Sequence, residues 1–234
     1  MKENNEFKNF VAAKARMLPV ILLLDVSGSM SYDNKIDELN TSVKEMIQSF
    51  TDEQILQAEI CVSIITFGSD VKLHTDLMPA RNISFADLTA YGATCMGKAF
   101  DLAGSMIEDK TKVPKNAYRP VVVLVSDGEP YDPEDPNNRE FEKQLERFTK
   151  EGRSSKCDRW SLAIGEDADA DMMKRFLDNP EKSVCYVDDT GDIHKFFRFI
   201  SSCTIQRSQS RNPNVVPEDL FNEDILNMNF EDFG

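Results

Sequence analysis

The sequence contains little histidine and no paired cysteines, which removes the usual material for soft-metal and histidine-based sites. Only two histidines, His74 and His194, occur among 234 residues, and neither belongs to a cluster. The cysteines are odd in number and contain no C-x-x-C pair, so we expect reduced, mostly buried thiols in a cytoplasmic protein. The five cysteines are Cys61, Cys95, Cys157, Cys185 and Cys203.

The chain also lacks a long apolar run and an excess of positive charge. Residues 18–24 are apolar but far too few to span a bilayer, and residues 1–16 have no apolar core typical of a signal peptide. The 41 acidic residues outnumber the 27 lysines and arginines, which gives a formal net charge of -14 at pH 7. A surface of this charge repels phosphate, so we expect neither a membrane nor a nucleic acid as the partner.

The segment Asp25-Val-Ser27-Gly-Ser29 directly follows the apolar residues 18–24. An apolar run that ends in Asp predicts a buried parallel strand that carries a carboxylate at its carboxyl end. Gly28 allows a tight turn, and we expect Ser27 and Ser29 to face the same open space. Each residue alone would be an ordinary cap or turn residue. Together, one carboxylate and two alcohols on a sharp loop are typical of a hard-cation site.

Two further oxygen donors occupy similar positions later in the chain. Asp127 ends a second apolar run, residues 121–126, and is followed by Gly128, while Thr94 lies in a short loop before a helical stretch. In a parallel sheet, loops at the carboxyl ends of neighbouring strands converge on one crevice. We therefore predict a metal site made only of hydroxyl and carboxylate oxygens. Its ligands are Asp25, Ser27, Ser29, Thr94 and Asp127.

These motifs resemble the von Willebrand factor A (vWA) domain, whose metal-ion-dependent adhesion site (MIDAS) combines D-x-S-x-S, a separate Thr and a later Asp-Gly. The resemblance runs from about residue 18 to residue 204 and is closest to the small bacterial TerY-like, tellurium-resistance-associated type. Segments such as Ser63-Ile-Ile-Thr-Phe67 support that subgroup. Ser126 stands where Thr is more usual, and Ala93 where Pro is more usual. Neither departure removes a ligand, so we predict an intact MIDAS.

The donor set also indicates the metal. Oxygen ligands alone exclude thiolate chemistry and disfavour Zn²⁺, whereas they suit Mg²⁺, with Mn²⁺ as a close substitute. The resemblance implies that the hydroxyls coordinate the ion directly or nearly so, while the two carboxylates hold bound waters and the hydroxyls. The ion would then complete its coordination with an Asp or Glu of a partner protein. The resemblance further implies a bacterial stress, tellurite-resistance or defence system, with a kinase or phosphatase of the same system among the partners.

Two other classes of function stay open as alternatives. A metal-dependent, haloacid-dehalogenase-like phosphatase also places an Asp at the end of its first parallel strand, but it needs a second acid two residues on, where this chain has Ser27. No phosphate-binding loop, nucleophile elbow or dinucleotide fingerprint occurs either, so we predict that the protein is not an enzyme. The third class is a metal-independent scaffold that binds through an acidic C-terminal tail.

Strand and helix patterns alternate along the chain. Residues 71–77 alternate between apolar and polar, which predicts a half-exposed antiparallel edge strand. The other expected strands are 18–24, 60–67, 121–126, 160–164 and 184–187, and the expected helices are 35–50, 96–107, 137–151, 171–177 and 193–205. This order predicts an α/β fold with a doubly wound, mostly parallel six-stranded sheet, one antiparallel edge strand and helices on both faces, as in Rossmann-like domains.

The predicted domain organisation is one vWA domain with short ends. We expect an N-terminal extension over residues 1–16, the domain over 17–206 and an acidic, disordered tail over 207–234. Residues 212–234 contain six acids and no Lys or Arg. One of two acidic segments inside the domain, residues 167–171, imitates the start of a calcium loop but is not expected to bind calcium. Residues 167–171 are predicted to lie around a helix N-terminus, and residues 131–136 to form a loop on the same rim as the metal.

Overall fold

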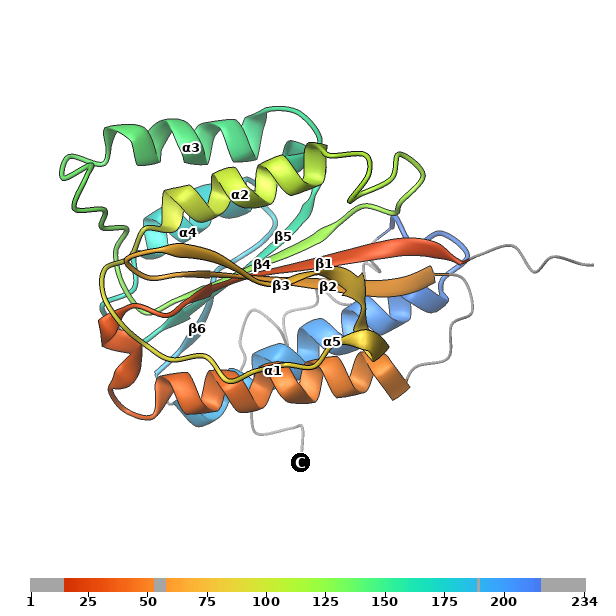
Figure 1. The fold of residues 1–234 in the computed structure, drawn as a ribbon, viewed down its shortest axis with the longest axis horizontal. Coiled ribbons are helices and arrows are strands. Elements are labelled where there is room, and N and C mark those ends of the chain that lie inside the picture. The colour runs from red at the N-terminus through yellow and green to blue at the C-terminus, as the bar shows by residue number, and fades with distance from the viewer. Residues whose placement is uncertain (1–14, 53–57, 189, 216–234) are drawn as a thin grey trace, which may run out of the picture.

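Six strands form one mixed sheet in the order β3-β2-β1-β4-β5-β6 (Figure 1). The structure, a computed structural model, describes residues 15–52, 58–188 and 190–215. The strands are β1 (Arg16–Asp25), β2 (Ala58–Phe67), β3 (Val71–Pro79), β4 (Val121–Ser126), β5 (Asp158–Ile164) and β6 (Cys185–Val187). Only β3 runs antiparallel to its neighbour among these strands, as the alternating pattern of residues 71–77 predicts.

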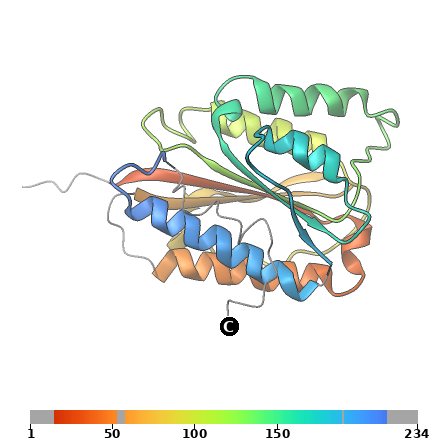
Figure 2. The same cartoon turned by 180° about the vertical axis from the view of Figure 1, so that it is seen from behind.

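The helices cover both faces of the sheet. They are α1 (Lys35–Asp52), α2 (Met96–Glu108), α3 (Arg139–Lys150), α4 (Ala170–Leu177) and α5 (Ile193–Gln209). Helices α1 and α5 lie on one face, and α2, α3 and α4 lie on the other (Figures 1 and 2). Figure 2 shows α5 beside α1 on this face of the sheet. The predicted doubly wound α/β fold is therefore confirmed.

Strand β1 reads as an unbroken apolar run because both of its faces are buried. Val20 and Leu22 pack into the core under α1 and α5. Ile21 and Leu23, which point the other way, pack into the second core under α2, α3 and α4. A central parallel strand with helices on each side leaves no solvent face for polar residues. In the part of the chain that the structure describes, no helix is both long and apolar enough to cross a membrane.

Helix α5 extends four residues beyond the predicted end at Ile205, because polar residues there find buried partners. Arg207 is 1% exposed. Its guanidinium donates to the carbonyl of Pro213 at 3.0 Å and forms an ion pair with Asp158 at 3.2 Å. Lys182 binds the other oxygen of Asp158 at 2.5 Å. The first residues of the expected tail therefore pack against the amino end of β5. Residues 216–234 of that tail and residues 1–14 of the expected extension over 1–16 lie outside the described residues.

The sheet also fixes where a site can form. Strands β1 and β4 lie next to each other in parallel, with Leu24 opposite Val125. The chain leaves β1 toward α1 on one face and enters β4 from α2 on the other. In such sheets, a crevice opens beyond the carboxyl ends of the two strands where the connections diverge. Asp25 and Asp127 lie at these two carboxyl ends.

Candidate metal centre

The loop after β1 folds its three predicted ligands against one another. Asp25 is the last residue of β1 and is fully buried. The backbone N–H of Ser27 donates to Asp25 Oδ1 at 2.7 Å. The hydroxyl oxygens of Ser27 and Ser29 lie 3.0 Å apart in a hydrogen bond. A short 3-10 helix over Gly28–Ser31 holds Ser29 in this position.

Asp127 joins this loop from the end of β4, across nearly one hundred residues of sequence. The hydroxyl of Ser29 donates to Asp127 Oδ1 at 2.7 Å. The hydroxyl of Ser126 donates to Asp25 Oδ2, which links the two strand ends a second time. Four of the five predicted ligands therefore form one hydrogen-bonded cluster.

The loop that contains Thr94 reaches the same rim through a backbone hydrogen bond. Gly28 donates its backbone N–H to the carbonyl of Gly92 at 3.0 Å, which joins the two loops. Gly92 has a φ of +81°, and a Cβ there would lie 2.0 Å from Ser69 Oγ, so the loop needs glycine. Thr94 itself is buried, and among the described residues no hydrogen bond links its hydroxyl to the other four ligands. Its loop is thus docked on the cluster without a direct side-chain bond.

The cluster combines buried negative charge with hard donors. Burial raises the pKa of Asp25 from 3.8 to about 6, against the effect of the hydrogen bonds from Ser126 and Ser27, and the nearby charge of Asp127 raises the pKa further. Both carboxylates are almost fully buried, and Lys35 forms an ion pair with one of them, at 2.7 Å from Asp127 Oδ2. Buried anions of this kind fit a small divalent cation with oxygen ligands. Among the described residues, no three His, Cys, Asp or Glu side chains gather into an alternative metal cluster.

Sequence reasoning missed two residues of this site, Ser126 and Lys35. Ser126 counted only as a departure from a family pattern, although its hydroxyl binds Asp25. Lys35 counted only as the start of a helix, although its ammonium binds Asp127. A lysine in the first turn of a helix opposes the helix dipole, and this was the one signal in the sequence that could have marked it.

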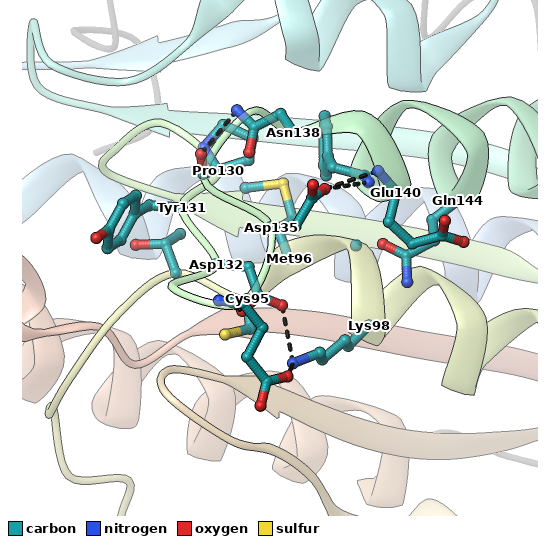
Figure 3. A pocket seen from close by; sticks show the side chains of 14 residues that line it. Cys95, Met96, Lys98, Pro130, Tyr131, Asp132, Asp135, Asn138, Glu140 and Gln144 are labelled. Atoms are coloured by element: carbon teal, nitrogen blue, oxygen red, sulfur yellow. Dashed lines mark hydrogen bonds and ion pairs between the residues drawn. The ribbon is translucent and has the colours of Figure 1, made fainter.

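A small cavity lies directly beside Thr94 (Figure 3). Its volume is about 160 Å³, and the acidic residues 131–136 form one wall. Thr94 and Tyr131 exchange two backbone hydrogen bonds of 3.0 Å, so this loop lies beside the loop of the predicted ligand Thr94. Lys98 binds both Asp132 and Glu134 at 2.8 Å, as the dashed line in Figure 3 marks for the first pair. Asp135 accepts backbone N–H groups at the start of α3.

Exposed tyrosines accompany all three loops of the site. Tyr32 follows the turn that contains Ser29, Tyr91 precedes Thr94 by three residues, and Tyr131 pairs with Thr94. Their exposed fractions are 68%, 38% and 55%. Three exposed tyrosines therefore lie on the loops that carry the predicted ligands.

The second acidic segment also behaves as predicted. Asp169 is the N-cap of α4, and its side chain accepts the backbone N–H of Met172 at 2.9 Å. A carboxylate in this position is stabilised by the helix dipole. The structure thus gives this segment a capping role at the start of α4.

Comparison with known proteins gives a consistent classification. Residues 20–129 match the family model of the von Willebrand factor type A domain. A von Willebrand factor type A protein from Catenulispora acidiphila has a TM-score of 0.62 at 16% identity, over 83% of this chain and 43% of that chain. Proximal thread matrix protein 1 from the mussel byssus, with a zinc-occupied MIDAS motif, has a TM-score of 0.60 at 13% identity, over 82% of this chain and 46% of that chain.

A third structure, the pilus adhesin SpaC from Lactobacillus rhamnosus GG in its open conformation, has a TM-score of 0.61 at 15% identity, over 82% of this chain and 30% of that chain. This chain spans less than half the length of each of these three proteins. No curated protein matches it. The fold is that of a Rossmann-like α/β domain. Within that class, the family match and the solved structures support a von Willebrand factor type A domain.

Proposed function

We propose that this chain is a protein-binding module that depends on a divalent metal ion. Asp25, Ser27, Ser29, Thr94 and Asp127 would hold Mg²⁺, with Mn²⁺ as a substitute, as an intact MIDAS. The observation that supports this proposal is the buried cluster at the ends of β1 and β4, where two carboxylates and two alcohols meet at one rim. The module acts by binding, without a chemical step, and the ion completes its coordination with an Asp or Glu of a partner protein.

The surface around the cluster supports a protein as the partner. Tyr32, Tyr91 and Tyr131 are exposed on the loops that carry the ligands. Tyrosine is enriched at protein interfaces because its ring gives apolar contact area and its hydroxyl forms hydrogen bonds. A partner that inserts a carboxylate at the centre would contact these rings around it.

The biological setting in this proposal rests on the sequence resemblance alone. We place the protein in the cytoplasm of a bacterium, in a TerY-like stress, tellurite-resistance or defence system. A kinase or phosphatase of the same system would be among its partners. The mussel neighbour with zinc in its MIDAS motif makes Zn²⁺ a necessary comparison in any metal titration.

Isothermal titration calorimetry with MgCl₂, MnCl₂ and ZnCl₂ tests the metal site. Asp25→Ala and Thr94→Ala should abolish Mg²⁺ binding while the circular dichroism spectrum stays that of a folded domain. Thr111→Ala is the matched control, because Thr111 binds Asp109 on an exposed loop. Equal Mg²⁺ affinity in the wild type and both site variants would overturn the proposal.

Affinity capture from the native cell, with and without EDTA, tests the partner. We compare the wild type with a variant truncated after residue 215. Proteins lost on chelation alone depend on the ion, as we propose. Proteins that stay bound in EDTA but are lost on truncation would instead favour the metal-independent scaffold.

A further inference from the structure

Lys35 lies in the metal site although no MIDAS motif includes it. It is the first residue of α1, and its Nζ lies 2.7 Å from Asp127 Oδ2, with 16% of the lysine side chain and 0% of the aspartate side chain exposed. The other oxygen of Asp127 accepts the hydroxyl of Ser29. Both oxygen atoms of this predicted ligand therefore already have a donor.

The position of Lys35 has a local cost that the ion pair offsets. A positive charge in the first turn of a helix is disfavoured by the helix dipole. The two residues before it, Asp33 and Asn34, have φ values of 52° and 61°, in the left-handed region. Such residues form a sharp turn that is disfavoured for side chains other than Gly, Asn and Asp. The chain thus turns sharply through two residues that tolerate this conformation and places a lysine against the helix dipole, where its partner is Asp127.

A second lysine of α1 shows what an ordinary surface pair looks like. Lys44 binds Asp87 at 2.6 Å, with 49% and 62% of the two side chains exposed. Solvent screens such pairs, and they contribute little to stability. The Lys35 pair is shielded from solvent on the aspartate side, so its charge acts on the cluster with little screening.

We infer that Lys35 is the resident cation of the metal site, which competes with the divalent ion for Asp127 and thereby lowers the affinity for metal. This inference rests on the proposed function. Lys35 offsets one of the two carboxylate charges, which reduces the attraction for an incoming ion. With a divalent ion present, the two carboxylates and Lys35 leave one excess positive charge. That excess favours an anionic ligand. Lys35 therefore lowers the affinity of the site for the metal ion and increases its attraction for the partner's carboxylate.

Calorimetric titration of MgCl₂ into the full chain at pH 8 tests the inference. We expect Lys35→Met to bind Mg²⁺ about tenfold more tightly, because one charge within 4–6 Å changes the binding of a proton by about ten- to a thousand-fold and acts on a metal ion in the same sense. Lys35→Arg keeps the charge and should bind as the wild type does. Lys44→Met removes a lysine from the same helix without touching the cluster and should also leave the affinity unchanged.

The outcomes separate this inference from the proposed function. Tighter binding by Lys35→Met alone supports the inference, since loss of a merely structural residue does not increase affinity. Equal or weaker binding by Lys35→Met, with normal binding by the wild type, overturns the inference and leaves the metal site intact. If neither protein binds Mg²⁺, the proposed function and the inference both fail. Urea unfolding of each variant in EDTA confirms that the compared proteins are folded.

Discussion

The buried carboxylate of Asp25 should make the metal-free protein less stable at neutral pH than a variant with a neutral side chain at this position. Burial raises the pKa of Asp25 from 3.8 to about 6 in the folded protein. The unfolded chain therefore loses this proton at a lower pH than the folded chain does. The stability that protonated Asp25 contributes to the folded protein is fully present below pH 3.8 and is lost as the pH rises through about 6. Each unit of pKa difference corresponds to about 1.4 kcal/mol, so the loss amounts to about 3 kcal/mol at pH 7.5.

Asp25→Asn removes this charge with almost no change in shape. The amide oxygen still accepts the backbone N–H of Ser27, but the charged hydrogen bond from Ser126 is lost, at a cost of about 1 kcal/mol. We therefore expect Asp25→Asn to raise the free energy of unfolding by about 2 kcal/mol at pH 7.5 in EDTA, while Mg²⁺ binding disappears.

Urea denaturation at pH 7.5 and pH 4.5, both in EDTA, measures this effect. The gain should shrink strongly at pH 4.5, where the folded wild type carries a protonated Asp25. Asp109→Asn is the control, because a hydrogen bond from Thr111 lowers the pKa of this exposed carboxyl, so no gain is expected. A wild type that is as stable as Asp25→Asn at pH 7.5, or a gain that is the same at both pH values, would refute the reasoning.

One further prediction concerns the buried ion pairs at the amino end of β5, and another concerns the loop of Thr94. Asp158→Asn leaves Lys182 and Arg207 as buried cations without their carboxylate, so the free energy of unfolding should fall by about 3–5 kcal/mol in urea denaturation. Gly92→Ala forces a left-handed φ of +81° on alanine in the loop of the predicted threonine ligand, and calorimetry should show weakened Mg²⁺ binding. Gly128→Ala, where a Cβ meets nothing within 4 Å, should bind Mg²⁺ normally; equal behaviour of the two glycine variants would contradict the second prediction.

The sequence carries most of the fold because the signals for it are local. Strand β1 is apolar at every position from Leu18 to Leu24 because each residue meets a helix on one face or the other. Strand β3 lies at the edge of the sheet, where Val71 and Leu77 are partly buried against one core, and its alternating sequence pattern identified the antiparallel edge. Leu73 departs from this pattern, because its side chain is 40% exposed. The end of α5 escaped prediction because Arg207 reads as a surface residue, and its partners Asp158 and Pro213 are close only in the folded chain.

The candidate site also combines residues marked by a local sequence pattern with residues that come close only in the folded chain. D-x-S-x-S is a local pattern, and the structure brings Asp25, Ser27 and Ser29 together with Asp127 as that pattern predicts. The role of Lys35 depends on a turn that brings the start of α1 back toward the end of β4, and no spacing in the sequence encodes that approach. Whether the five predicted ligands hold a metal ion stays a prediction.

The short antiparallel pairing of Thr94 with Tyr131 joins two loops that have different expected roles. The loop of Thr94 carries a hydroxyl that we predict to be a metal ligand. The loop of Tyr131 carries the tyrosine ring and the acidic residues that a partner protein would contact in the proposed function. Two backbone hydrogen bonds tie these loops to each other. In the proposed function, a partner protein that contacts the outer loop would therefore contact a segment bonded directly to the predicted threonine ligand, so that metal binding and partner binding would be coupled.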